Sequence, residues 1–358
     1  MEVSRLLALA AGLMSIAATP RPTEPPLSAR VEAAVSVEMS RLGIPGLTVA
    51  VVTDGQLQWV NGYGLADVEN NVPAKASTAY RIASLSKPMT AVAAMQLAEA
   101  GKLDLDAAVQ RYVPGIPEAW SAITMRQLLS HQSGIRHVQD EEWGSTRHYF
   151  SVVSSLDVFR DDPLLFPPGT KAEYSTYGFT LAGCVIEKAA EKPFLDALRD
   201  QVWSPAGMES TRADDVYEVI PNRASGYRRL ATGELIHSVL ADTSNKIPGG
   251  GLCSTAPDVA RFAVALLGGG LLKRETWEAM SAPQRIREGR VTGYGLGWRV
   301  GSYKGRREVW HHGGQPRVSG LLYLQPEKRF AIVLLANLEN VYLPLTELAR
   351  QLSLQLAR

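Results

Sequence analysis

Residues 47–63 read LTVAVVTDGQLQWVNGY, and this stretch decides the fold class. Leu47 to Val52 is apolar and rich in β-branched residues, and Leu57 to Tyr63 is a second strand-like run. Asp54-Gly55 lies between them, and an Asp-Gly pair between two such runs is a strong signal for a β-hairpin. The sheet of this protein therefore begins with two antiparallel strands.

The remaining strands are predicted near the other end of the chain. Strand-like runs follow at 293–300, 308–311, 318–324 and 330–336, and residues 343–356 form a final amphipathic helix. A helical period over 28–43 precedes the hairpin and stops at Gly43. Another helix is expected at 256–268, capped by Thr255 or Ser254.

The middle of the chain is different, because few strand runs interrupt it. Helix-like segments separated by Pro and Gly loops are expected at 84–100, 107–112, 124–130, 155–160, 177–190 and 193–202. We therefore predict an α+β fold: an antiparallel β-sheet flanked by helices, with an inserted all-helical lobe. The sheet lobe covers about 28–83 and 250–358, the helical lobe covers about 84–249, and a site is expected in the cleft between them.

Composition narrows the classes of function. The chain has 358 residues, 46% hydrophobic and 20% charged, as in a soluble globular protein with one large or two interleaved domains. The net charge is +1, which does not favour nucleic acid as a partner. The two cysteines, Cys184 and Cys253, form neither a disulfide framework nor a metal cluster, and the sequence leaves open whether they are bridged or free.

The N-terminus is typical of an export signal. Arg5 precedes an apolar run at 6–18 that is too short to span a bilayer and ends in small residues. We expect a signal peptide at 1–18, a Pro-rich spacer at 19–27, and an exported protein, periplasmic or extracellular, without a stable membrane anchor. A disordered or interfacial N-terminal helix is the alternative.

Ser84-Leu85-Ser86-Lys87 is the first motif that carries chemistry. Residues three apart lie on one face of a helix, so Ser84 and Lys87 would point the same way at a helix N-terminus. A serine hydroxyl needs a neighbouring base, and a lysine can serve if desolvation or positive charge lowers its pKa. Alone, the motif also fits a surface serine beside a solvated lysine.

Tyr174-Ser175-Thr176 is the second motif, between a Pro/Gly turn and an apolar helix. Such a tyrosine can present its hydroxyl to a cleft. Beside a cationic lysine its phenolate becomes more accessible and can act as a general base. The alternative is a packed aromatic ring with one satisfied hydroxyl.

His311-His312-Gly313-Gly314 is the third motif, between two strand-like segments. A strand-edge N–H there could form an oxyanion hole together with the Ser84 N–H. Adjacent histidines on a strand point to opposite faces, so a metal pair is not favoured. His131 is interpreted as structural, and we expect neither a metal nor an organic cofactor.

Taken together, these motifs and their order resemble the serine β-lactamase and penicillin-binding-protein superfamily, in its class C-like branch. The linking phrases match too, at 62–67, 81–84, 128–134, 168–170, 249–255 and 294–298. Segments at 133–137, 162–166 and 174–178 are similar to the mitochondrial serine β-lactamase-like proteins of animals, peptidases that form filaments. The resemblance covers about residues 30 to 355.

The resemblance implies roles for individual residues. Ser84 would be the acylated nucleophile, Lys87 its activator and Tyr174 the base that later activates water. The Ser84 and Gly314 N–H groups would form the oxyanion hole. The substrate-binding residues would be those at the remaining motif positions: Thr176, His311, His312 and Gly313.

Two departures from the family pattern bear on the substrate. Thr176 replaces an asparagine and cannot offer an amide that both donates and accepts. His311 replaces a lysine and so removes a fixed positive charge that would hold an antibiotic carboxylate. Both changes favour a small-molecule ester or a peptide over a β-lactam.

The leading hypothesis is a serine hydrolase that forms an acyl-enzyme, acting as an esterase or peptidase. A β-lactamase or D,D-carboxypeptidase is the alternative within the superfamily. From another class, the alternative is a non-catalytic peptide-binding or filament-forming scaffold. A homo-oligomer is compatible with each of these.

Overall fold

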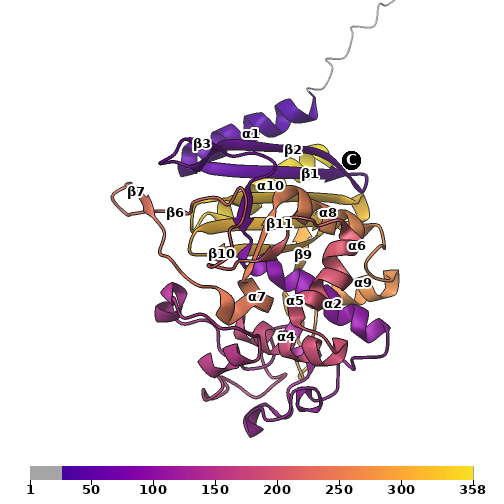
Figure 1. The fold of residues 1–358 in the computed structure, drawn as a ribbon. Coiled ribbons are helices and arrows are strands. Elements are labelled where there is room, and N and C mark those ends of the chain that lie inside the picture. The colour runs from indigo at the N-terminus through magenta and orange to yellow at the C-terminus, as the bar shows by residue number, and fades with distance from the viewer. Residues whose placement is uncertain (1–25, 358) are drawn as a thin grey trace, which may run out of the picture.

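The computed structural model describes residues 26–357. A seven-stranded antiparallel sheet, in the order β3-β2-β1-β12-β11-β10-β9, crosses the upper half of the molecule in Figure 1. Because β1 pairs with β12, strands from the two ends of the chain meet at the centre of the sheet, as predicted. The strands are β1 (Gly46–Thr53), β2 (Gln56–Asp67), β3 (Val72–Pro73), β9 (Arg299–Tyr303), β10 (Arg306–Gln315), β11 (Val318–Gln325) and β12 (Phe330–Ala336).

The predicted hairpin is confirmed. Asp54 and Gly55 have φ angles of 54° and 74°, the two positive values that a tight hairpin turn with the right twist requires. The strand expected at 293–300 is wrong in its bounds, because β9 begins only at Arg299. Residues before it form a turn in which Gly297 has a φ of 81°.

Both faces of the central strands are buried, so β1 and β12 are apolar without alternation. On one face, Val49 and Leu334 pack with the helices α1 (Leu27–Leu42) and α10 (Tyr342–Leu356), which contact each other. On the other face, Ala50 and Val333 pack with α8 (Ala256–Leu267). Thr255 caps α8 by accepting from Asp258 N–H, as predicted.

Most of the middle of the chain lies in the lower half of Figure 1, although residues 227–237 lie beside the sheet in the upper half. It is mainly helical, as predicted, but three short strands also lie within 84–249, so the lobe is not purely helical. The short strands are β5 (Arg212–Ala213), β6 (Tyr227–Arg229) and β7 (Leu235–His237). The helices are α2 (Ser86–Glu99), α3 (Met125–Leu129), α4 (Tyr177–Ala190), α5 (Phe194–Leu198), α6 (Ser204–Ala206) and α7 (Ile247–Gly250), followed beyond the lobe by α9 (Arg274–Met280).

Several expected helices are shorter turns. The 3₁₀ turns are η1 (Ala83–Leu85), η2 (Val109–Arg111), η3 (Glu118–Trp120), η4 (Asp140–Gly144), η5 (Ser154–Val158), η7 (Ser244–Lys246) and η8 (Pro326–Lys328), and η6 (Arg199–Trp203) is π-helical. The helices expected at 107–112 and 155–160 are η2 and η5, too short to propagate i→i−4 hydrogen bonds. The helix expected from Ser84 begins as η1 and becomes α-helical only at Ser86.

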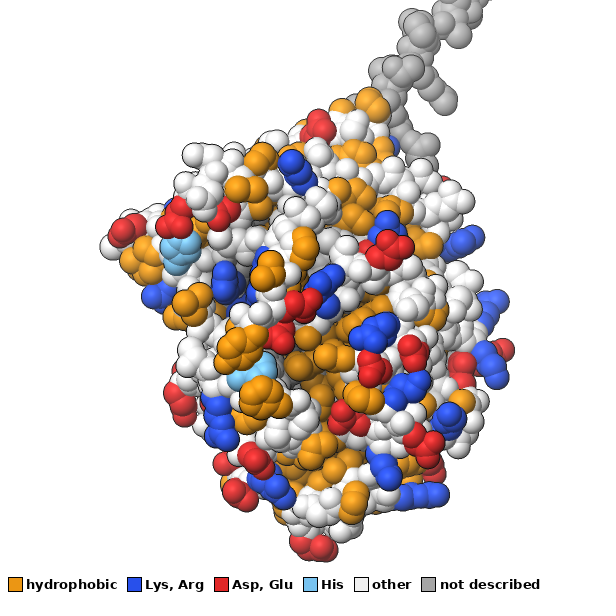
Figure 2. All heavy atoms as spheres, viewed as in Figure 1, with side chains coloured by type: hydrophobic (Ala, Val, Ile, Leu, Met, Phe, Trp, Pro, Cys, Tyr) orange, Lys and Arg blue, Asp and Glu red, His pale blue; other side chains and the backbone are white. Residues whose placement is uncertain are grey.

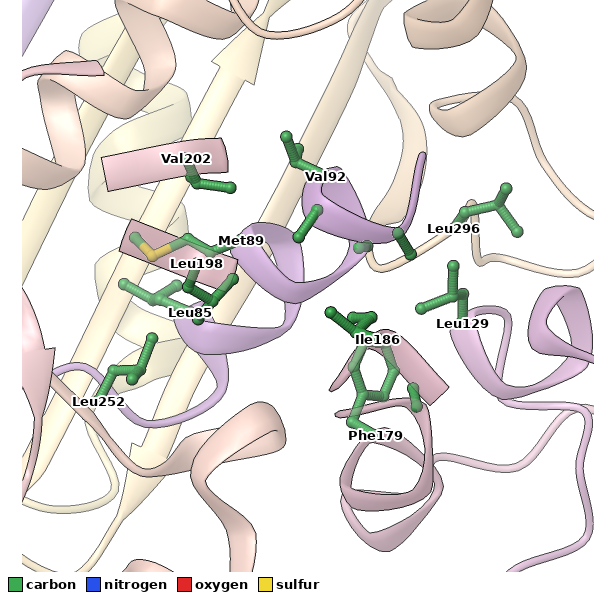
Figure 3. Close-up of a cluster of buried hydrophobic side chains, with 14 of the residues drawn as sticks. Leu85, Met89, Val92, Leu129, Phe179, Ile186, Leu198, Val202, Leu252 and Leu296 are labelled. Carbon is green, nitrogen blue, oxygen red and sulfur yellow. The ribbon is translucent and has the colours of Figure 1, made fainter. Parts of the chain in front are cut away.

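Helix α2 lies between the sheet lobe and the helical lobe and packs against both. Eleven of its 14 residues are buried, as expected for a helix without a polar face. In Figure 3, Leu85 and Met89 point toward Leu198 and Val202, while Phe179 of α4 lies on another side. The chain leaves the sheet lobe through β4 (Ala79–Arg81) and returns through β8 (Leu252–Thr255), and these two strands pair. This packing fixes the position of Ser84.

The remaining sequence predictions concern surface and termini. Cys184 and Cys253 are both free and buried. On the face shown in Figure 2, basic and acidic side chains are interspersed. No helix within 26–357 is long and apolar enough to cross a membrane. The predicted signal peptide at 1–18 lies outside the described residues, as does the spacer at 19–27 up to residue 25.

Candidate active site

Ser84 is the one accessible residue in a buried stretch. From Thr78 to Met95 every residue except Ser84 is buried. The preceding residue, Ala83, has a φ of 47°, a left-handed conformation that a non-glycine residue adopts at a cost. The rival Ser86 is fully buried and donates its hydroxyl to the Ala83 carbonyl 2.7 Å away. The backbone therefore presents Ser84 alone.

Lys87 is fully buried directly beside Ser84. Its Nζ lies 3.1 Å from Ser84 Oγ, 3.0 Å from Thr176 Oγ1 and 2.6 Å from the Gly249 carbonyl oxygen. Burial, with added repulsion from Lys246 and Arg299, holds the pKa of Lys87 well below its ordinary value of 10.5. Burial therefore favours the neutral amine of Lys87, the form that can accept a proton.

Tyr174 completes the group on the other side of Ser84. Its hydroxyl donates to Ser84 Oγ at 2.8 Å, and Lys87 Nζ lies 4.8 Å from its ring centroid. Burial raises the pKa of Tyr174 well above its ordinary value, and the hydrogen bond with Ser84 offsets this only in part. This corrects the expectation of an accessible phenolate, because burial disfavours the charged forms of both Lys87 and Tyr174.

Two histidines hold the tyrosine triplet in place. His131 Nδ1 accepts from Ser175 N–H and His137 Nδ1 accepts from Thr176 N–H, each at 3.2 Å. Their rings also lie against Tyr174, with centroids 4.5 and 5.1 Å away. Burial keeps the pKa of His131 well below 6.5 and lowers the pKa of His137 to about 4. Both imidazoles are therefore neutral, as an Nδ1 acceptor must be.

Strand β10 brings the third motif to the same place. A methyl group on Gly313 would lie 2.4 Å from the Ile82 carbonyl oxygen, so glycine allows β10 to pack against the nucleophile turn. Gly314 lines the same cavity as Ser84, where the second oxyanion donor is predicted. Gly313 itself is placed in this packing contact rather than in the cavity lining.

The two histidines of β10 have separate partners. His311 Nδ1 donates to the His312 carbonyl oxygen at 2.7 Å, and burial beside Lys87 holds the pKa of His311 well below 6.5. His312 Nε2 lies 2.9 Å from Thr346 Oγ1 on α10, and burial lowers the pKa of His312 to about 4. Both histidines line the cavity, and their role in substrate binding stays a prediction, whereas Thr176 is buried and accepts from Lys87.

Two cations of the site, Arg299 and Lys246, were not among the residues expected from the sequence. Arg299 lines the cavity, directly after the glycine-rich 294–298 phrase. Lys246 is almost fully buried, with its Nζ 3.0 Å from Asn245 Oδ1 and 5.6 Å from the Trp143 ring centroid. Burial lowers the pKa of Lys246 to about 8. Neither residue belongs to one of the three motifs. Tertiary packing brings both near Ser84.

The site combines a nucleophile with two groups that can transfer protons. Within the part of the chain that the structure describes, no group of three or more His, Cys, Asp or Glu side chains could hold a metal ion. The cavity has a volume of about 520 Å³, in the range of small-molecule sites. A partly exposed serine between an amine of lowered pKa and a phenol can attack a carbonyl carbon and pass on the proton that it loses.

Known proteins match both the chain and its fold. Residues 31–355 match the family model described as Beta-lactamase. The human protein named Serine beta-lactamase-like protein LACTB, mitochondrial, is 31% identical over an alignment covering 80% of this chain and 70% of that protein. These matches confirm the predicted superfamily resemblance.

Two solved structures show the same fold. The octameric penicillin-binding protein homologue from Pyrococcus abyssi has a TM-score of 0.78 at 25% identity, covering 92% of this chain and 78% of that one. The D-amino acid amidase from Ochrobactrum anthropi SV3 complexed with D-phenylalanine has a TM-score of 0.81 at 24% identity, covering 93% and 99%. The predicted fold class is confirmed.

Proposed function

Because this chain belongs to the β-lactamase family and is a serine hydrolase of that kind, we propose that Ser84 is acylated during a two-step cleavage of ester or amide bonds. The observation that carries this proposal is the placement of Ser84 Oγ, 3.1 Å from Lys87 Nζ and 2.8 Å from the Tyr174 hydroxyl. Ser84 is also the accessible residue of a buried stretch.

The hydrogen bonds support a definite resting state. A neutral Lys87 has two N–H groups, which the Gly249 carbonyl and the Thr176 hydroxyl can accept. Ser84 Oγ lies 3.1 Å from Lys87 Nζ and accepts from Tyr174, and for acylation the Ser84 hydroxyl would donate to the lone pair of the neutral amine. In this arrangement each proton has one acceptor.

Acylation follows from that state. The Ser84 proton passes to Lys87 Nζ as Oγ bonds to the substrate carbonyl carbon, and the Ser84 and Gly314 N–H groups stabilise the oxyanion. The carbonyl then re-forms, the bond to the leaving oxygen or nitrogen breaks, and that atom takes up a proton from the Lys87–Tyr174 pair.

Deacylation is the same sequence with water. Water gives a proton to the Tyr174–Lys87 pair as its oxygen attacks the acyl carbon, and Ser84 leaves with a proton restored to Oγ. Neither step requires a metal or an organic cofactor. The replacements at Thr176 and His311 favour an ester or peptide over a β-lactam, and the D-amino acid amidase with the same fold supports the inclusion of amides.

Intact mass after incubation with a fluorophosphonate tests the nucleophile. We expect one adduct on the wild-type protein and none on Ser84→Ala, because the probe labels only an activated serine. The fully buried Ser86→Ala is the matched control and should label like wild type. A well-folded wild-type protein without an adduct would contradict the catalytic proposal and favour the scaffold alternative.

Location and assembly are further parts of the proposal. The apolar run at 6–18 supports export through a cleaved signal peptide, which N-terminal sequencing of secreted protein would test. The octameric archaeal homologue supports a homo-oligomer, which sedimentation at several protein concentrations would test. A mature chain that keeps residue 1, or a concentration-independent monomer, would contradict these parts.

A further inference from the structure

Lys246 is a buried lysine without an acidic partner. Its side chain is 2% exposed, and among residues 26–357 no carboxylate oxygen lies within ion-pairing distance of its Nζ. The Nζ donates one hydrogen bond, to Asn245 Oδ1 at 3.0 Å, and lies 5.6 Å from the ring centroid of Trp143, which lines the cavity. Burying an ammonium group without a counter-charge costs free energy, and proteins accept such costs mainly at functional sites.

The segment that carries Lys246 also contacts the catalytic residues. The turn η7 ends at Lys246 and α7 follows at once, where the Gly249 carbonyl oxygen accepts from Lys87 Nζ at 2.6 Å. A methyl group on Gly250 would lie 3.9 Å from Lys246 Cδ and 3.8 Å from the carbonyl carbon of Ala83. The stem of Lys246 and the nucleophile turn therefore flank the same glycine, so Lys246 lies behind the wall of the active site.

Charged groups from four segments face Lys246, and none of them neutralises it. They are Arg81 on β4, Asp214 beyond β5, Asp242 before η7 and Glu142 on η4. Each acid already has a basic partner: the pairs are Arg81–Asp214, His148–Asp242 and Arg136–Glu142. Burial, with repulsion from Arg81, lowers the pKa of Lys246 only to about 8, so its ammonium persists at neutral pH.

Lys87 likewise faces cations but no acid within the part of the chain that the structure describes. Lys246 and Arg299 repel a proton on Lys87, and the other titratable groups around it are uncharged rings at neutral pH. These are Tyr174, whose pKa burial raises, and His131, His137 and His311, whose pKa values burial lowers. Arg299 lines the cavity and is partly exposed, so solvent and salt screen its charge, whereas Lys246 is enclosed by protein.

We propose that Lys246 is a positioning residue of the catalytic centre, whose buried ammonium repels a proton from Lys87 and so keeps that amine ready to accept the Ser84 proton. During acylation the proton moves from Ser84 Oγ to Lys87 Nζ, and two neighbouring ammonium groups are then buried together. Their repulsion favours transfer of the proton onward to the leaving oxygen or nitrogen. This inference rests on the proposed function and adds a residue, outside the three motifs, that acts through Lys87.

The pH dependence of Ser84 labelling by a fluorophosphonate tests this inference. Lys246→Met keeps an apolar stem and removes the charge, so the acid limb of the labelling rate should move about one unit toward higher pH. Rates on that limb should fall about tenfold. Above about pH 8 wild-type Lys246 is itself neutral, so the two proteins should label at similar rates there. Lys246→Gln should behave in the same way, while Lys273→Met, which removes an exposed lysine before α9, controls for net charge and should follow wild type.

The outcomes distinguish this inference from the function on which it rests. An unchanged profile, or a rate that falls by the same factor at every pH, would overturn the inference and leave Lys246 a packing role. If neither variant folds, the wild-type protein decides: raising the salt from about 0.05 to about 0.5 M should move the acid limb by less than about 0.2 pH unit, because the buried charge is not screened. A movement of about one unit would assign the effect to Arg299 and overturn the inference. A wild-type protein without a Ser84 adduct would instead remove the proposed function itself.

Discussion

The two faces of the central sheet bury different kinds of side chain. Against α1 and α10, the contact is dominated by aliphatic side chains such as Val35, Leu334 and Leu352, all fully buried. Toward the helical lobe, the fold also buries ionisable side chains, among them Lys87 and Lys246. Apolar burial stabilises a fold, whereas burying an ionisable group costs free energy and shifts its pKa. The first layer therefore supplies stability and the second supplies chemistry.

The largest expected effect is a loss of activity without a loss of fold. Lys87→Met has nearly the same shape but no basic nitrogen, so kcat/KM should fall by at least about 10³-fold, within the range for a general base. Thermal unfolding should remain cooperative, because Met fits a buried pocket. Ester hydrolysis and circular dichroism together check this. Retention of more than a tenth of wild-type activity would mean that Lys87 is not the base.

The opposite effect is expected in the apolar layer. Leu352→Ala empties a fully buried position of α10 and should lower the free energy of unfolding by about 2–5 kcal/mol. Activity per folded molecule should not change, because Leu352 does not line the cavity and packs on the face of the sheet that carries α1 and α10. Urea denaturation followed by assay well below the midpoint measures both. The exposed Leu343→Ala on the same helix is the control, with an effect within about 0.5 kcal/mol.

A smaller effect concerns the pH dependence of the chemical layer. The folded-state pKa of His137, lowered to about 4, lies below its unfolded value of about 6.5. As pH falls, the unfolded chain therefore binds the proton first, so the stability from neutral His137 is complete above pH 6.5 and is lost between 6.5 and 4. His137→Asn, which keeps an acceptor but does not titrate, should reduce the loss of unfolding free energy between pH 7 and 5 by about 1–2 kcal/mol. Parallel pH profiles for the two proteins would contradict this role.

Local sequence accounts for much of the fold. The Asp54-Gly55 hairpin, the helix that ends at Gly43 and the Thr255 cap each depend on backbone preferences or hydrogen bonds within a few residues, and the structure confirms all three. The strand expected from Gly293 failed because an apolar, glycine-containing run fits a turn as well as a strand. Periodicity does not tell the two apart when neighbouring strands decide the pairing.

By itself, the sequence determined the family and the three motifs that meet at Ser84. It also determined that strands from both ends of the chain form one sheet. These features can be predicted from the types of residue and their spacing along the chain. Only the tertiary structure decided the pKa shifts and the neighbours: burial lowers the pKa of Lys87, two histidines accept from the backbone after Tyr174, and Arg299 lines the cavity that contains Ser84. Desolvation and through-space charge depend on what packs around a group, and residues distant in sequence supply that packing.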